Sequence, residues 1–163
     1  MRVLTWTKNV FDSNYQLFSD NQIIGNLVFN MWQHSATGLF ENQTFFFKSS
    51  GFLGSDTQIF DINHQVLGKI KVHSLALNAT VELTNGDRYL WHANSMFLNS
   101  WQLGASEDKM VKCNGASGSG FITEQNVDQS IVLLAGLFIK ETFAKMFFFI
   151  IMLIFIWFCL YKF

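Results

Sequence analysis

The chain contains no proline and only two cysteines among its 163 residues. The lack of proline excludes proline-rich linkers and recognition segments. Cys113 and Cys159 lie far apart, and Cys159 falls within an apolar tail, so they provide neither a disulfide framework nor the spacing of a zinc site. No apolar segment precedes Asp12, so we predict no secretory signal and expect a reducing, cytoplasmic setting.

Charge is also scarce. Charged residues make up 14% of the chain, against about 25% in typical soluble domains. The formal net charge of -1 argues against a nucleic-acid partner, because such proteins usually carry a basic excess. What the chain has instead is 50% hydrophobic residues, including 19 phenylalanines, with the longest apolar runs in its last third.

The clearest internal pattern is a repeat of about 43 residues. Gln22–Gly25 matches Gln65–Gly68, and the aromatic run Phe45–Phe47 matches Tyr89–Trp91. A third copy begins at Trp101 and breaks off where its own aromatic strand is expected, because the apolar tail follows there. Such self-similarity indicates that one supersecondary unit is used three times.

Each copy has the pattern of four short antiparallel strands. Ile70 and Val72 alternate with Lys69, Lys71 and His73, which is the period of two of a half-buried strand. Asn85-Gly86 is a strong hairpin signal. In the second copy we predict strands at Gln58–Asp61, Gln65–Ser74, Leu77–Leu83 and Arg88–Ala93.

Three such copies give eleven or twelve strands within residues 1–125, and a long meander is expected to close into a barrel that leaves no edge strand. A barrel of that size has more interior than its own side chains fill. The fold class we predict is therefore mainly β, a barrel of about twelve antiparallel strands with a hydrophobic C-terminal helix that threads it and extends beyond it.

The tail predicts that helix, with Asn126 or Asp128 as the N-cap. Residues 126–145, which include the apolar run Ile131–Ile139, are assigned to the barrel interior. Residues 146–161 are assigned to a bilayer, because sixteen residues follow without a charged side chain. Representative positions of this membrane segment are Met146, Phe149, Leu153, Trp157 and Tyr161.

Two alternatives stay open for the tail. It forms one continuous buried helix, or it packs against a protein partner or a second copy of a soluble, cytoplasmic chain. The membrane interpretation makes the protein a single-pass membrane protein with a C-terminal anchor. Lys140 and Lys145 precede the anchor and Lys162 follows it, so the positive-inside rule favours a cytoplasmic barrel.

This combination resembles the tubby C-terminal-like superfamily, which includes tubby domains, phospholipid scramblases and LURP-one-related proteins. The residues that carry the resemblance are Gln65–Ile70 with its copy at Gln22–Leu27, and Leu133–Ile139 at the helix start. The resemblance covers roughly residues 1–145, and the local pattern also looks like small bacterial members of this group. It implies a lipid-facing or membrane-tethered role without catalysis, and it transfers no ligand motif.

No motif predicts an enzyme, a metal site or a cofactor. The four histidines lack zinc spacing, and neither a phosphate-binding loop nor a G-x-S-x-G elbow is present. Lys48, Lys69, Lys71 and Arg88 form a candidate patch for anionic lipid head groups. The alternative for these four residues is a solvated outer barrel face that discourages aggregation.

Overall fold

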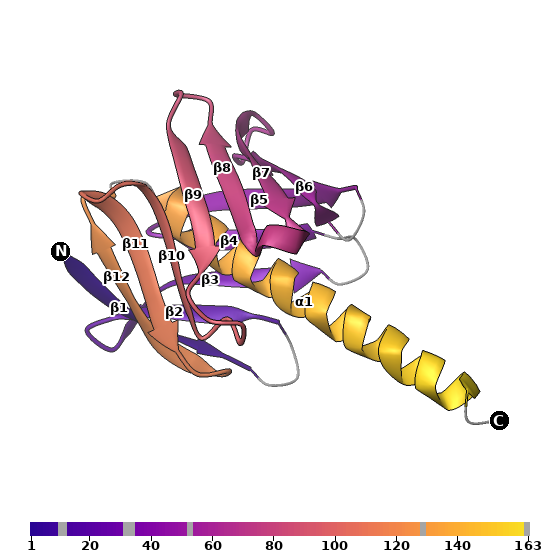
Figure 1. The fold of residues 1–163 in the computed structure, drawn as a ribbon. Coiled ribbons are helices and arrows are strands. Elements are labelled where there is room, and N and C mark those ends of the chain that lie inside the picture. Colours follow the sequence, from indigo (N-terminus) through magenta and orange to yellow (C-terminus); the bar gives the residue numbers. More distant parts are fainter. Residues whose placement is uncertain (10–12, 31–34, 52–53, 128–129, 162–163) are drawn as a thin grey trace.

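The computed structural model describes residues 1–9, 13–30, 35–51, 54–127 and 130–161. These residues form twelve antiparallel strands around one long helix (Figure 1). The strands are β1 (Arg2–Lys8), β2 (Tyr15–Ser19), β3 (Gln22–Asn30), β4 (Ser35–Phe40), β5 (Gln43–Ser50), β6 (Asp56–Phe60), β7 (Val66–His73), β8 (Asn78–Leu83), β9 (Arg88–Ala93), β10 (Ser100–Ser106), β11 (Lys109–Gly115) and β12 (Ser119–Gln125). The helix α1 spans Ser130–Tyr161, and a 3-10 turn, η2 (Ser74–Ala76), joins β7 to β8.

Each strand pairs with its neighbours in the sequence, and β1 pairs with β12 to close the barrel. The predicted fold class is thereby confirmed. The predicted strand ends of the second copy agree with the structure to within two residues. Ile70 and Val72 point inward and are buried, whereas Lys69, Lys71 and His73 are exposed on the outer face, as the alternation predicts.

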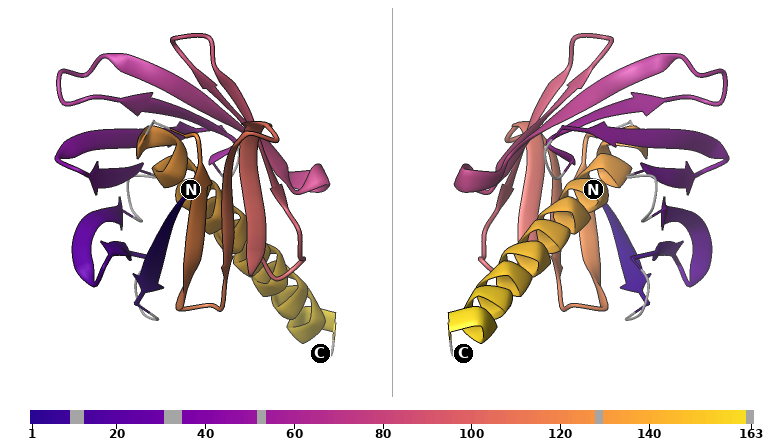
Figure 2. Two further views of the ribbon diagram at one scale, coloured as in Figure 1. Left: turned by 90° about the vertical axis from the view of Figure 1, so that its left-hand side faces the viewer. Right: turned by 90° about the vertical axis from the view of Figure 1, so that its right-hand side faces the viewer.

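The barrel has two distinct ends (Figure 2). Ser130 and Ile131 share a hollow with Asn85, so we call this the entry end of α1. The turns at Asp20–Asn21 and Glu41–Asn42 lie there as well, because strand direction alternates around a meander. At the opposite, exit end lie η2, the connection from β9 to β10 and the connection from β11 to β12.

Strand β1 completes the third repeat. It lies beside β12 as β5 lies beside β4 and β9 beside β8. In all three places a large aromatic side chain of the fourth strand faces a small residue of the third, which leaves room for the ring inside the barrel. The pairs are Phe47 with Ala36, Trp91 with Ala79, and Trp6 with Gly120. The repeat in the sequence does not reveal the role of β1, because β1 lies at the start of the chain and its partner β12 lies at the end of the barrel.

The helix start differs from the predicted N-cap. Helix α1 begins at Ser130, and Asn126 lies four residues earlier with a left-handed φ of 49°. Asn126 is therefore not the N-cap, because an N-cap residue directly precedes the first helical turn in an extended conformation. Asp128, the other predicted cap, lies outside the described residues.

Helix α1 fills the barrel interior along its first half. The side chains from Ile131 to Phe143 are all buried, which agrees with the plug predicted from the apolar run. Phe138 stacks on Phe29 and Phe47, with ring centroids 5.5 and 4.9 Å apart. Phe143 stacks on Trp91 at 5.1 Å. The barrel core is thus built from rings contributed by both the strands and the helix.

The second half of α1 leaves the barrel without a break in the helix (Figure 1). Among the described residues, Met146 is the last buried one, and every residue from Phe148 to Tyr161 is exposed. The barrel mouth therefore lies one or two residues beyond Lys145, where we placed the boundary. The alternative of a helix buried over its whole length does not describe this structure.

Gly136 lies where helix α1 closely approaches Trp101 of the barrel wall, so it shows how tightly the helix is packed. A Cβ atom at this position would lie 2.5 Å from Cη2 and 2.6 Å from Cζ3 of Trp101. Alanine favours a helix over glycine by about 1 kcal/mol, but overpacking a core costs about 1–3 kcal/mol. We therefore expect Gly136→Ala to lower the free energy of unfolding, measured by denaturant titration in detergent micelles.

The control is the same substitution in a Trp101→Phe background, because phenylalanine lacks both clashing atoms. There Gly136→Ala is expected to raise stability through its helix propensity. Equal stabilisation by Gly136→Ala in both backgrounds would show that Trp101 does not limit the approach of the helix.

Candidate functional site

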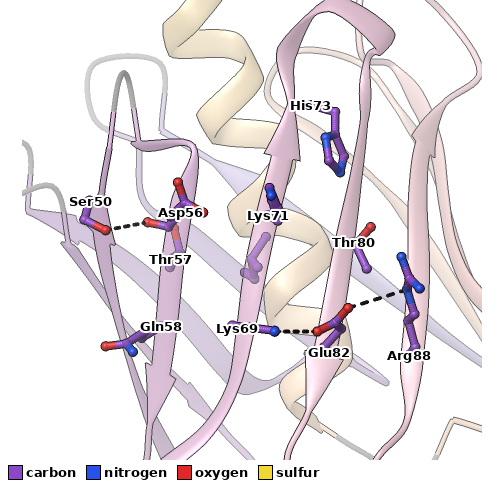
Figure 3. A pocket seen from close by; sticks show the side chains of 11 residues that line it. Ser50, Asp56, Thr57, Gln58, Lys69, Lys71, His73, Thr80, Glu82 and Arg88 are labelled. Carbon is purple, nitrogen blue, oxygen red and sulfur yellow. Dashed lines mark hydrogen bonds and ion pairs between the residues drawn. The ribbon is translucent and has the colours of Figure 1, made fainter.

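A groove runs along the outer face of β6, β7, β8 and β9 (Figure 3). It has a volume of about 650 Å³, and all of its lining residues except Ile70 are polar or charged. The lining residues are Ser50, Asp56, Thr57, Gln58, Lys69, Ile70, Lys71, His73, Thr80, Glu82 and Arg88. The charged residues gather here because alternate positions of adjacent strands point to the same face of a sheet.

Two of the groove cations share one carboxylate. Lys69 Nζ lies 2.7 Å from Glu82 Oε2, and Arg88 Nε lies 3.7 Å from Glu82 Oε1 (Figure 3). The hydrogen bond from Lys69, together with the charges of Lys69, Arg88 and Lys71, lowers the pKa of Glu82 below its ordinary value. Glu82 therefore stays ionised and neutralises part of the positive charge in the groove.

Lys71 is the groove cation whose charge is least compensated. Asp56 is its register partner on β6, but no ion pair joins the two within the described part of the chain. With Lys69 and Arg88 set against Glu82, the groove carries three cationic and two acidic side chains. This balance suits a small anionic group that is held by Lys71 and by the hydrogen-bonding side chains around it.

The structure brings together three of the four residues of the predicted patch. Lys69, Lys71 and Arg88 line the groove, whereas Lys48 lies outside it on β5. The Lys48 ammonium lies over the ring of Phe60, 5.4 Å from its centroid, as a cation–π contact. His73, which the sequence did not single out, lines the groove because it continues the outward row of Lys69 and Lys71.

A second polar cluster lies inside the barrel, close to the exit end. Glu141 Oε2 accepts hydrogen bonds from Lys8 Nζ at 2.6 Å and from the Tyr15 hydroxyl at 2.9 Å. Burial alone would raise the pKa of Glu141, but hydrogen bonds from Lys8, Ser13 and Tyr15 hold this pKa below its ordinary value. Burial and the neighbouring Glu141 charge raise the pKa of Tyr15. The cluster ties β1 and β2 to α1.

Lys140 contributes a buried cation without an ion pair in the described residues. Its ammonium lies over the ring of Trp6, 3.9 Å from the centroid, and 5.6 Å from that of Tyr15. Burial lowers the pKa of Lys140 to about 8. Burial also raises the pKa of the nearby Cys113 thiol to about 11, so this thiol is a poor nucleophile at neutral pH.

From the sequence, Lys140 indicates only the orientation of the anchor, and Glu141 is not predicted as part of a site. Two adjacent charges inside a segment assigned to a barrel interior already imply buried partners, because an unpaired charge is costly to bury. The partners Lys8 and Tyr15 could not be named from the pattern, since they lie more than 120 residues away in the chain.

No group of three or more His, Cys, Asp or Glu side chains is arranged for a metal ion within the described ranges. Comparison of the chain with family models, with curated proteins and with solved structures finds no match. The interpretation of the groove and the tail therefore depends on their physical chemistry.

The buried Lys140 predicts a pH dependence of stability. The unfolded chain holds this proton up to about pH 10.5, whereas the folded chain releases it at about pH 8. Because the unfolded state binds more protons between these values, stability rises with pH in this window. The rise attributable to Lys140 between pH 7.5 and 8.5 is about 0.7 kcal/mol.

The measurement compares denaturant midpoints of the parent chain and Lys140→Met at both pH values. The variant keeps the volume of the side chain but lacks the titrating amine, so a smaller rise is expected. Burial also lowers the pKa of Lys145, which leaves a residual slope in the variant. Identical slopes in the two proteins would contradict a buried, charged Lys140.

Proposed function

We propose that this chain is a single-pass membrane protein whose C-terminal segment, residues 146–161, anchors a barrel that binds anionic lipid head groups. The observation that carries the proposal is the emergence of α1. From Phe148 to Tyr161 the helix is apolar and exposed on every side. A helix that is hydrophobic all round needs lipid or protein around it.

The dimensions support an anchor. Helix α1 is long and apolar enough to cross a membrane, and only 11% of its most apolar 18 residues is buried in the barrel. Sixteen residues, 146–161, span about 24 Å at 1.5 Å per residue. Lys145 precedes this segment, and Trp157 and Tyr161 lie near its end with ring centroids 4.8 Å apart. Aromatic side chains of this kind favour a membrane interface.

The groove supports a binding role for the barrel. Lys69, Lys71 and Arg88 meet on one outer face, with hydroxyl and amide groups beside them. Such a surface fits the phosphate of a lipid head group better than an apolar ligand. A non-enzymatic, membrane-associated role also agrees with the resemblance to the tubby C-terminal-like superfamily. We propose a cytoplasmic barrel, because Lys145 lies on the barrel side of the anchor.

Membrane fractionation with an alkaline carbonate wash tests the anchor. The full chain is compared with a version that ends at Phe147, since Met146 and Phe147 still pack against the core. We expect the full chain in the membrane pellet and the truncated chain in the supernatant. Near-ultraviolet circular dichroism of the buried tryptophans checks that the truncated barrel is folded.

Two other outcomes would overturn the anchor. If the full chain is soluble and its oligomeric state changes on truncation, the tail is an association surface for a second copy or a protein partner. If both versions are soluble and have the same oligomeric state, the exposed half of α1 is neither a membrane anchor nor an association surface.

The groove is tested by titrating the detergent-solubilised full chain with glycerophosphate, a soluble stand-in for an anionic head group. Lys71→Glu is expected to weaken binding about fivefold or more, which corresponds to about 1 kcal/mol for an exposed charge. Glu82→Gln is expected to tighten it, because the substitution releases Lys69 and Arg88 from their shared carboxylate. Isothermal titration calorimetry measures both changes.

Lys112→Glu is the matched control. Lys112 is exposed on the outer face of β11, away from the groove, and the substitution changes the net charge by the same amount. Equal weakening by Lys71→Glu and Lys112→Glu would show that glycerophosphate responds to the overall charge of the barrel and that the groove is not a binding site.

A further inference from the structure

The two ends of the barrel differ in charge. At the entry end, each of the five turns between strands contains an acidic residue. These residues are Asp20, Glu41, Asp61, Asp87 and the pair Glu107 and Asp108. At the exit end, the described residues of the connections carry no charge. These residues are 9, 13–14, 51, 54–55, 74–77, 94–99 and 116–118.

The exit end also exposes large apolar side chains on two neighbouring connections. Leu75 in η2 is fully exposed, and Met96 and Phe97 between β9 and β10 are 77% and 84% exposed. The two connections are adjacent, because Ala93 N donates a hydrogen bond to Leu77 O at 3.4 Å. The entry end exposes Met1, Ile23 and Ile62 as well, but these side chains lie beside the acidic turns of Glu41, Asp20 and Asp61.

The length of the free helix limits how far a bilayer can lie from this end. No linker separates the barrel from the exposed part of α1, since the helix is continuous from Ser130 to Tyr161. The fully exposed part, Phe148–Tyr161, is about 21 Å long. A hydrocarbon core is about 30 Å thick. If the barrel stood clear of the lipid, the described exposed part of α1 would cover only about two thirds of that thickness.

We infer that the exit end of the barrel is seated in the interface of the bilayer that holds the anchor, with Leu75, Met96 and Phe97 inserted at the boundary between head groups and acyl chains. This inference rests on the proposed function. Because the connections at the exit end are uncharged, this end enters the interface at a low desolvation cost. The inserted side chains add apolar surface next to the exposed part of α1. The acidic turns at the entry end then face away from the membrane.

The position of the exit end in the interface also determines how far the groove lies from the lipid head groups. The groove begins at Ser50, Asp56 and His73, which lie at the exit end of their strands. Lys71 lies two residues before His73, or about 7 Å along β7. With the exit end in the interface, Lys71 stands at head-group height. Arg88 lies at the entry end of β9, farther from the membrane.

The test uses a depth-sensitive fluorophore on the full chain in phosphatidylcholine vesicles that contain phosphatidylglycerol. Single cysteines are introduced at Phe97 and at Leu75 in a Cys159→Ser background, in which the remaining Cys113 is buried. An NBD label is attached at each position. Asn85→Cys at the entry end is the matched control for an exposed connection, and Leu153→Cys reports on the anchor.

We expect lipids with a nitroxide near the head group to quench labels at positions 97 and 75 at least twofold more than the label at 85. A deep nitroxide should quench the label at 153. If 153 is quenched and both 97 and 75 behave like 85, the inference is wrong and the anchor stands. If 153 is not quenched, the anchor and the inference fail together.

Discussion

The rest of the structure depends on the filling of the barrel by α1. Twelve strands enclose more space than their own inward side chains occupy. The residues Ile131–Phe143 take up that space and are buried from all directions. A helix in such a place has to be apolar around its whole circumference, so it has no polar face. For this reason the part of α1 inside the barrel is, apart from Lys140, Glu141 and Thr142, as apolar as the part outside it.

The threefold repeat explains how short strands form a barrel that is wide enough to hold a helix. In each repeat a large ring on the fourth strand faces a small residue on the third, so the wall and the helix interlock. The closure is completed by β1, which brings Trp6 opposite Gly120 and gives the third repeat its missing aromatic strand. Closure also separates the two ends of the barrel, and the acidic turns and the apolar connections fall on opposite ends.

Among the residues described, buried charged side chains lie near both ends of the barrel. Glu124 is buried beside Arg2 at the entry end, and Lys140 and Glu141 lie close to the exit end. Glu141 is held by Lys8 and Tyr15, and Lys140 lies over Trp6. These contacts link the first two strands to the helix at the side from which the exposed half emerges. They also mark the change between the two environments of α1, because a charge in the exposed apolar half would have no protein partner.

Local patterns in the sequence are sufficient to predict the strands, their inward and outward faces, and an apolar helix after the barrel. These predictions use the period of two in the strands, the turn at Asn85-Gly86 and the repeat. Such patterns can be recognised in the sequence without knowledge of the fold. Four features become visible only in the folded barrel: the place of β1, the partners of Glu141, the position of Lys48 outside the groove, and the residue at which α1 leaves the barrel. These depend on contacts between segments far apart in the chain, and on side-chain directions that a periodic pattern does not contain.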